Sequence, residues 1–290
     1  MQRTTARQIV LAVMLIAGWG AQRSATAFDE AAACQCTCAR RGAWTVAETP
    51  NFTLWTHGDL EIARRCAIRC EALRRELISA WTENEAIGEW SPLCAVVIHS
   101  TQAEYRLSVN ASDESAGCTT VTCDQGRVIF RRIDLRGDVA DWQRNALPHE
   151  LTHVVLADQL IDCSVPTWLN EGMAMLSESE ALQTQRLTLL ERAAAARRLP
   201  ELAEVLDDGQ RSRLDANLRY AASLSLVRWL EQQGGRQRLL QYARHVRQSG
   251  NDESLRGAFA IEGGLPELEQ QWHASFAAHR LRASPALAER

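Results

Sequence analysis

Residues 147–156 read LPHELTHVVL, an apolar helical stretch that carries two histidines four positions apart. Residues four apart lie on one face of an α-helix, so the imidazoles of His149 and His153 can bind the same metal ion. Glu150 lies beside that face, where a carboxylate can take a proton from water activated by the metal. The spacing predicts two metal ligands and a general base; the alternative is a buried histidine pair with a structural role only.

A catalytic zinc ion normally takes three protein ligands, so a third must come from another segment. Residues 166–174 read PTWLNEGMA and begin with a proline, which is typical of a first helical turn. Spacings of three and four from Trp168 and to Met175 place Glu171 on the inward face of this helix. The alternative is a solvated carboxylate near a helix start. We expect one Zn²⁺ per chain, held by the two histidines and Glu171.

The character of the sequence changes shortly before this motif. Strand patterns occur at 52–57, 94–98, 119–122 and 127–133, the last two joined by a hairpin turn at 124–126, and an amphipathic helical pattern lies at 60–81. Later, Ala, Leu, Arg and Glu recur at helical spacing, which predicts helices at 141–160, 166–178, 182–198, 213–233, 236–247 and 266–282. The predicted fold class is α+β. A mixed strand and helix half with an edge strand (44–137) precedes an all-helical half (138–282), with the zinc site in the cleft between them.

The N-terminus has the pattern of a secretory signal peptide. Arg3 and Arg7 precede the apolar run 9–19, and Ala25-Thr26-Ala27 provides the small residues of a cleavage site. A membrane anchor is the alternative, but the run is shorter than the roughly 20 residues that span a bilayer. We therefore expect a signal peptide at 1–27, export to the periplasm or the extracellular space, and no membrane span in the mature chain.

The charge composition excludes some classes of function. The 290 residues contain 32 basic and 36 acidic side chains, a net charge of −4, so nothing indicates a nucleic-acid partner. All the basic residues are Arg, which excludes Schiff-base chemistry on lysine. The oligomeric state does not follow from the sequence.

Nine cysteines favour disulfides if the chain is exported. Cys118 and Cys123 bracket the hairpin, and we expect them to bridge across it. A Cys-rich N-terminal arm at 28–43 contributes three cysteines that we expect to reach Cys66 and Cys70 on the 60–81 helix; a second zinc site in the arm is the alternative. The odd total leaves one thiol unpaired or bonded to another chain.

The sequence resembles the gluzincin zinc metallopeptidases, specifically the compact peptidase MA-like domains of exported bacterial proteins. The resemblance rests on His149-Glu150-Leu151-Thr152-His153 followed by Trp168-Leu169-Asn170-Glu171-Gly172-Met173-Ala174. Softer matches are Tyr220-Ala221-Ala222-Ser223, Gly234-Gly235 and the segment 265–272, so the similar region spans roughly Phe52 to Phe276.

This resemblance implies a peptidase that acts on peptide or protein substrates. Zinc would bind His149, His153 and Glu171, Glu150 would activate water, and Tyr220 would stabilise the oxyanion; the alternative for Tyr220 is a buried helix aromatic. The family's edge strand pairs with extended substrate, and 127–133 is the expected edge strand. Arg131 and Arg132 would then favour acidic side chains, unless they are only a solvated strand end.

Two departures from related enzymes shape this expectation. The Gly-x-Met-x-Asn segment of zinc aminopeptidases is absent, which favours an endopeptidase. Met175 stands where thermolysin-like enzymes carry an acidic residue that orients a zinc ligand, so Asp158, Asp162 or Glu178 would have to orient the ligands.

Two rival functions differ in chemistry from a peptidase. One is a catalytically idle binding or cell-envelope scaffold of the same fold, against which the intact Glu150 argues. The other is a zinc hydrolase that acts on a non-peptide amide.

Overall fold

The computed structural model describes residues 7–14, 35–82, 88–109, 115–161, 163–207 and 214–283. The chain divides into two units, Met1–Ile161 and Asp162–Arg290. Much of the expected signal peptide and arm, at 1–6 and 15–34, lies outside the described residues, as do the last residues, 284–290.

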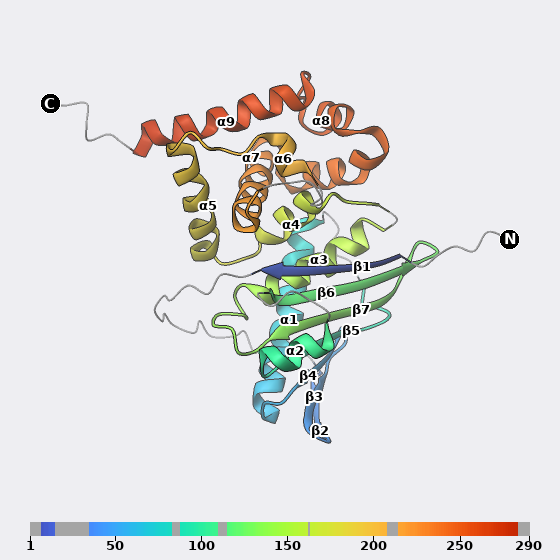
Figure 1. Cartoon of the computed structure of the whole chain (residues 1–290). Helices are drawn as coiled ribbons and strands as arrows, with labels where there is room; N and C mark the ends of the chain where they lie inside the picture. The colour runs from blue at the N-terminus through green and yellow to red at the C-terminus, as the bar shows by residue number, and fades with distance from the viewer. Residues whose placement is uncertain are drawn as a thin grey trace. The chain divides into compact units, whose positions relative to one another are not determined.

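The first unit is built on a seven-stranded mixed sheet with the order β1-β6-β7-β5-β4-β3-β2 (Figure 1). The β4–β5 and β5–β7 pairs are parallel, and the other neighbouring pairs are antiparallel. The strands are β1 (Arg7–Met14), β2 (Thr37–Arg41), β3 (Trp44–Glu48), β4 (Phe52–Thr56), β5 (Cys94–His99), β6 (Ser115–Asp124) and β7 (Arg127–Arg136).

The predicted hairpin is confirmed, but the predicted edge strand is wrong. β6 and β7 pair through Asp124 and Arg127, and Gln125 and Gly126 between them both have positive φ, as a tight hairpin turn requires. However, β7 also pairs with β5 from Arg131 to Arg136, so residues 131–133 of the predicted edge strand are interior, while the pairing with β5 does not extend to 127–130. Among the described strands the edges are β1, within the expected signal peptide, and β2, within the expected arm.

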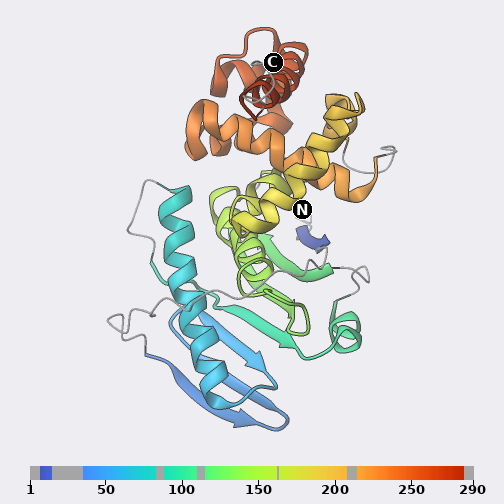
Figure 2. The ribbon, with the colours of Figure 1, turned by 90° about the vertical axis from the view of Figure 1, so that its left-hand side faces the viewer.

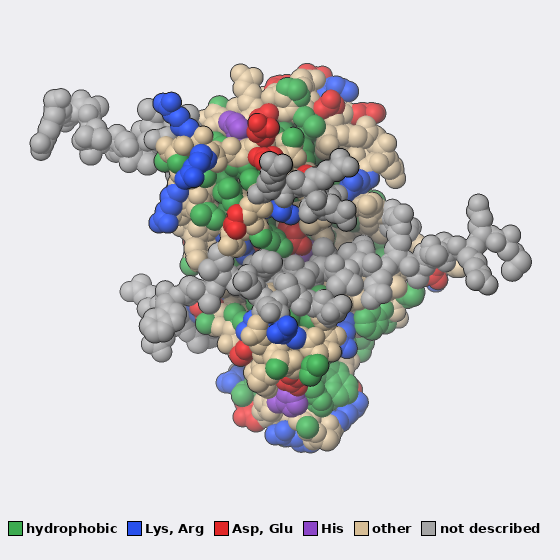
Figure 3. Space-filling view, viewed as in Figure 1, with side chains coloured by type: hydrophobic (Ala, Val, Ile, Leu, Met, Phe, Trp, Pro, Cys, Tyr) green, Lys and Arg blue, Asp and Glu red, His purple; other side chains and the backbone are tan. Residues whose placement is uncertain are grey.

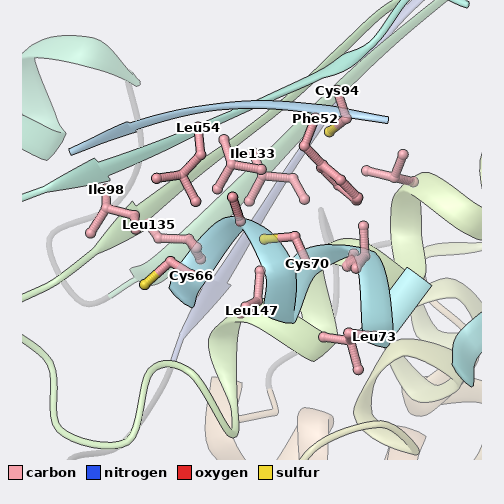
Figure 4. Close-up of a cluster of buried hydrophobic side chains, with 14 of the residues drawn as sticks. Phe52, Leu54, Cys66, Cys70, Leu73, Cys94, Ile98, Ile133, Leu135 and Leu147 are labelled. Carbon is pink, nitrogen blue, oxygen red and sulfur yellow. The ribbon is translucent and has the colours of Figure 1, made fainter. Parts of the chain in front are cut away.

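Helices α1 (Leu60–Trp81) and α3 (Ala146–Gln159) pack on one face of the sheet. Asp59 caps α1 by accepting a hydrogen bond from the Ile62 backbone N–H at 2.7 Å. The core joins strand side chains such as Ile133 to Cys70 on α1 and Leu147 on α3 (Figure 4). The stripe predicted at 60–81 is therefore the buried face of α1.

Helix α2 (Gln102–Ser108) packs on β5 and β7 (Figure 2). Its Tyr105 ring lies edge-on to His99 at a centroid separation of 5.7 Å. His99 follows Ile98 on β5, and Ile98 belongs to the core under α1. Because successive side chains on a strand point to opposite faces, α2 covers the face opposite to α1 and α3.

Helices and the loops between them make up the described residues of the second unit, with no strand among them. Helix α7 breaks at Gly235, whose φ of 73° is not helical, close to the predicted boundary at the Gly-Gly pair. The α+β class is thus confirmed, with a mixed sheet followed by helices. The helices are α4 (Thr167–Met175), α5 (Glu180–Ala195), α6 (Leu202–Leu206), α7 (Ala216–Ser249), α8 (Asn251–Phe259) and α9 (Gly264–Ala283).

The eight described cysteines form no disulfide bond. Cys118 and Cys123 both lie on β6, and five residues of extended strand separate them by about 17 Å, so they cannot bridge across the hairpin. Cys66 and Cys70 face the core, and burial raises the pKa of the Cys66 thiol to about 11. A raised pKa keeps this thiol protonated and unreactive at neutral pH.

Two surface properties bear on possible partners. Figure 3 shows acidic and basic side chains interspersed on one face of the described surface. No helix in the described part of the chain has the length and apolar character needed to cross a bilayer.

Candidate metal centre

Helix α3 carries the His-Glu-x-x-His motif inside the first unit. All residues from Ala146 to Leu156 are buried, including the polar side chains of the motif. Pro148 is the third residue of the helix, in the first turn, where its missing N–H breaks no helical hydrogen bond. Helix α3 therefore begins without a kink and holds both histidines on one face.

The two imidazoles face each other across one helical turn. Nε2 of His149 and Nε2 of His153 are 3.1 Å apart, and the rings are inclined at 72°. Zn–N bonds of about 2.0–2.1 Å at a tetrahedral angle would place two nitrogen ligands about 3.3 Å apart. The observed separation fits two ligands of one zinc ion.

Glu171 supplies the oxygen donor of the predicted set. In the described part of the chain, one group of three side chains qualifies as a metal site: His149, His153 and Glu171. All three are buried, and their ligand atoms lie within 4.8 Å of one another. Two imidazoles and a carboxylate are a donor set that suits zinc.

The Glu150 carboxylate is held by strand β6. Thr119 Oγ1 lies 2.7 Å from Glu150 Oε2 and 3.0 Å from the Glu150 backbone oxygen, as donor to both. Glu150 is fully buried. A hydrogen bond to one carboxylate oxygen restrains the side chain. Nothing in the sequence pattern of β6 indicated this role for Thr119.

Gly117 on β6 makes room for the same carboxylate. A Cβ atom at this position would lie 2.7 Å from both Cγ and Oε1 of Glu150, closer than real Cβ contacts allow. The glycine is required by the close approach of helix α3, since its own backbone φ is not positive. Strand β6 therefore supplies both a hydrogen bond and the space for Glu150.

We expect Gly117→Ala to displace Glu150 and to lower any hydrolysis that Glu150 catalyses by up to about 100-fold, because small misplacements of catalytic groups are costly. Steady-state kinetics and thermal unfolding would measure the change. Gly88→Ala is the matched control, since a Cβ at Gly88 meets nothing within 4 Å. Wild-type activity in Gly117→Ala would contradict this account of Glu150.

Glu171 is buried in the second unit on helix α4. The helix begins after Pro166, whose carbonyl accepts the backbone N–H groups of Leu169 and Asn170 at 3.1 and 3.0 Å. Gly172 lets α4 approach α7 closely, because a Cβ there would lie 2.4 Å from Val227 Cγ2. The inward orientation predicted for Glu171 is thus confirmed by its burial.

Tyr220 and Glu171 line the same cavity of about 80 Å³ in the second unit. Tyr220 is half-buried in the second turn of α7. This helix is capped by Asp215, which accepts the N–H groups of Asn217 and Leu218 at 3.0 and 3.3 Å. The arrangement permits a phenolic hydroxyl to act beside the predicted metal ligand. The remaining lining residues are Thr167, Trp168, Val205, Asp207, Ala216, Arg219 and Ser223.

The acidic residues considered for orienting the ligands have other partners. Asp158 accepts a hydrogen bond from Arg131 at 2.5 Å. Glu178 accepts two from Arg186. Asp162 lies outside the described residues.

The predicted substrate-binding arginines are also tied to acidic residues. Arg131 is buried and paired to Asp158, while Arg132 bonds both carboxylate oxygens of Asp134 at 2.7 Å. Arg131 is therefore not the solvated strand end that its sequence position allowed. With β7 interior, neither arginine lies on a free edge strand.

The alternative zinc site in the N-terminal arm is only partly within the described residues. Cys36 and Cys38 place their sulfur atoms 3.8 Å apart, while Cys34 lies outside the described part. Neither belongs to a group of three potential ligands among the residues that the structure describes.

The comparisons with known proteins agree with this geometry. A family model described as the Peptidase MA superfamily matches residues 92–278, which is more than half of the chain. The matched region begins just before β5 and ends within α9, so β1 to β4 and α1 precede it. A search of curated proteins finds no match. The chain belongs to the Peptidase MA superfamily.

Proposed function

We propose that this chain is a zinc-dependent metallopeptidase of the gluzincin type. The proposal rests on the buried carboxylate of Glu150, which accepts a hydrogen bond from Thr119. Glu150 directly follows His149 on α3, whose imidazole lies against that of His153. Membership of the Peptidase MA superfamily supports peptide or protein substrates. The three-residue donor group supports one zinc ion per chain.

Each residue of the site has a defined task in this proposal. A zinc ion held by the two histidines and Glu171 would polarise the scissile carbonyl and lower the pKa of water to about 7. Glu150 accepts the proton of the attacking water and passes it to the leaving amine. Burial of Glu150 excludes bulk water, which would otherwise compete for that proton.

Tyr220 is the proposed donor to the oxyanion that forms during attack on the carbonyl. A hydroxyl donor placed for the transition state contributes about 3 kcal/mol to lowering the barrier. Its shared cavity with Glu171 supports this role.

Two finer features of the proposal rest on the sequence. The chain has no Gly-x-Met-x-Asn segment, which supports an endopeptidase. The pattern of residues 1–27 supports export to the periplasm or the extracellular space.

Digestion of a proteome-derived peptide library by the zinc-loaded protein tests the activity. We expect cleavage at internal peptide bonds, read by mass spectrometry, and loss of cleavage after removal of zinc by a chelator. Restoration by added zinc is the control for denaturation. A chain that binds zinc and cleaves no library peptide would contradict the proposal and would favour the idle scaffold or a hydrolase of non-peptide amides.

A further inference from the structure

A buried ion pair connects the turn after helix α4 to helix α5. Arg186 Nε donates to Glu178 Oε2 at 3.0 Å, and Arg186 Nη2 donates to Glu178 Oε1 at 3.1 Å. The side chains are only 4% and 0% exposed. Two parallel hydrogen bonds fix the plane of the guanidinium group as well as its position.

The segment that carries Glu178 is itself held firmly. Gln183 Nε2 donates to the backbone oxygens of Leu176 and Glu178 at 3.3 and 2.9 Å. Ser179 caps α5 by accepting the Leu182 N–H at 3.3 Å. The carboxylate that orients Arg186 therefore lies on a restrained turn.

The guanidinium group contacts Tyr220. The Arg186 Cζ atom is 5.7 Å from the centroid of the Tyr220 ring, within the range of a cation–π interaction. Tyr220 comes from α7, so the contact joins the α4–α5 turn to the helix that carries the proposed oxyanion donor. A fixed planar cation on the ring face restricts rotation about the Cα–Cβ bond, which is the rotation that would move the hydroxyl oxygen.

A purely stabilising role does not account well for this pair. Removing two charges from water is costly, and apolar side chains of similar volume often replace a buried ion pair without loss of stability. What apolar side chains do not supply is a cation of defined orientation against the tyrosine ring.

We propose that Glu178 and Arg186 are positioning residues that hold the Tyr220 hydroxyl in its reactive orientation. The inference rests on the proposed function, since it concerns the donor in the proposed reaction. The pair acts through Tyr220, so its effect on catalysis requires the phenolic hydroxyl.

A double replacement tests this dependence without leaving one charge buried and unpaired. We expect Glu178→Met with Arg186→Met to lower kcat about tenfold and to change KM less than about twofold. The same double replacement in a Tyr220→Phe chain should cause no further fall in kcat. Replacing the partly exposed Glu231–Arg236 pair by methionines in the same way is the matched control, with an expected change below about twofold.

A spectroscopic measurement reports on Tyr220 without relying on activity. The chain contains three tyrosines, so ¹³C-labelled tyrosine gives a simple NMR spectrum in which Tyr220→Phe identifies one signal. The Tyr220 ring signal should shift and sharpen when the Glu178–Arg186 pair is replaced, while the Tyr105 and Tyr242 signals stay in place.

The outcomes separate the positioning role from the proposed function. An unmoved Tyr220 signal, or equal falls in kcat with and without the hydroxyl, would overturn the positioning role while the peptidase stands. A zinc-loaded wild-type chain that cleaves no peptide would overturn the proposed function, and the role in catalysis with it, even if the Tyr220 signal responds to the pair.

Discussion

Glu150→Gln should lower the rate of peptide hydrolysis by about 100- to 10,000-fold, the range that a general base contributes. The glutamine side chain has nearly the same shape, and its amide oxygen can still accept the hydrogen bond from Thr119. This bond is 2.7 Å long in the wild-type chain. What the amide lacks is a basic oxygen for the proton of the attacking water. The loss should therefore appear in kcat, with the fold and the zinc content retained.

Three measurements on one preparation would check this result. Kinetics would give kcat and KM, elemental analysis would give zinc per chain, and thermal unfolding would show that the variant folds. Glu253→Gln, at an exposed position on α8, is the matched control for a lost carboxylate. Unchanged turnover in Glu150→Gln would refute the role of Glu150 as base.

Replacement of a predicted ligand should remove the metal. We expect about one zinc per wild-type chain and near zero for His153→Ala, because two remaining ligands bind zinc far more weakly than three. Glu171→Ala should lose zinc as well. Zinc that binds only the folded chain stabilises it by about 2.7 kcal/mol at a concentration one hundred times its Kd, and this increment should vanish in both variants.

The control for this experiment uses the N-terminal cysteines. Cys36→Ser with Cys38→Ser should keep the full zinc content, because this pair belongs to no three-residue ligand group among the described residues. Elemental analysis after dialysis would decide between the sites. Zinc retained by His153→Ala but lost from the cysteine variant would place the metal in the arm and contradict the proposed centre.

Local patterns in the sequence predicted secondary structure correctly where buried residues recur at a regular spacing along one helix or strand. The apolar stripe of α1 and the hairpin of β6 and β7 follow from residue spacing. Side chains of a helix or a strand return to the same face at a fixed spacing, so burial of one face repeats along the sequence. For the same reason, spacing alone predicted that His149 and His153 share one face. Those features depend on residues close in sequence.

Strand β7 shows where the family resemblance misled. The expectation of an edge strand at 127–133 came from the substrate-binding strand of that family and not from a pattern of residues. In the structure Asp158 and Asp134 neutralise Arg131 and Arg132, so the strand lies in the interior of the sheet despite its charges. β2 and β3 were missed because neither alternates between buried and partly exposed residues, whereas β4, of the same length, does.

The sequence by itself determined the candidates for metal chemistry: two histidines, a neighbouring carboxylate and a distant glutamate whose types and spacing suit zinc. Only the tertiary structure decided what holds those groups. Thr119 and Gly117 meet Glu150 from another strand, and Arg186 meets Tyr220 from another helix. Such contacts join residues that are 31 to 34 positions apart in the chain, and no periodicity along one element encodes which of them meet.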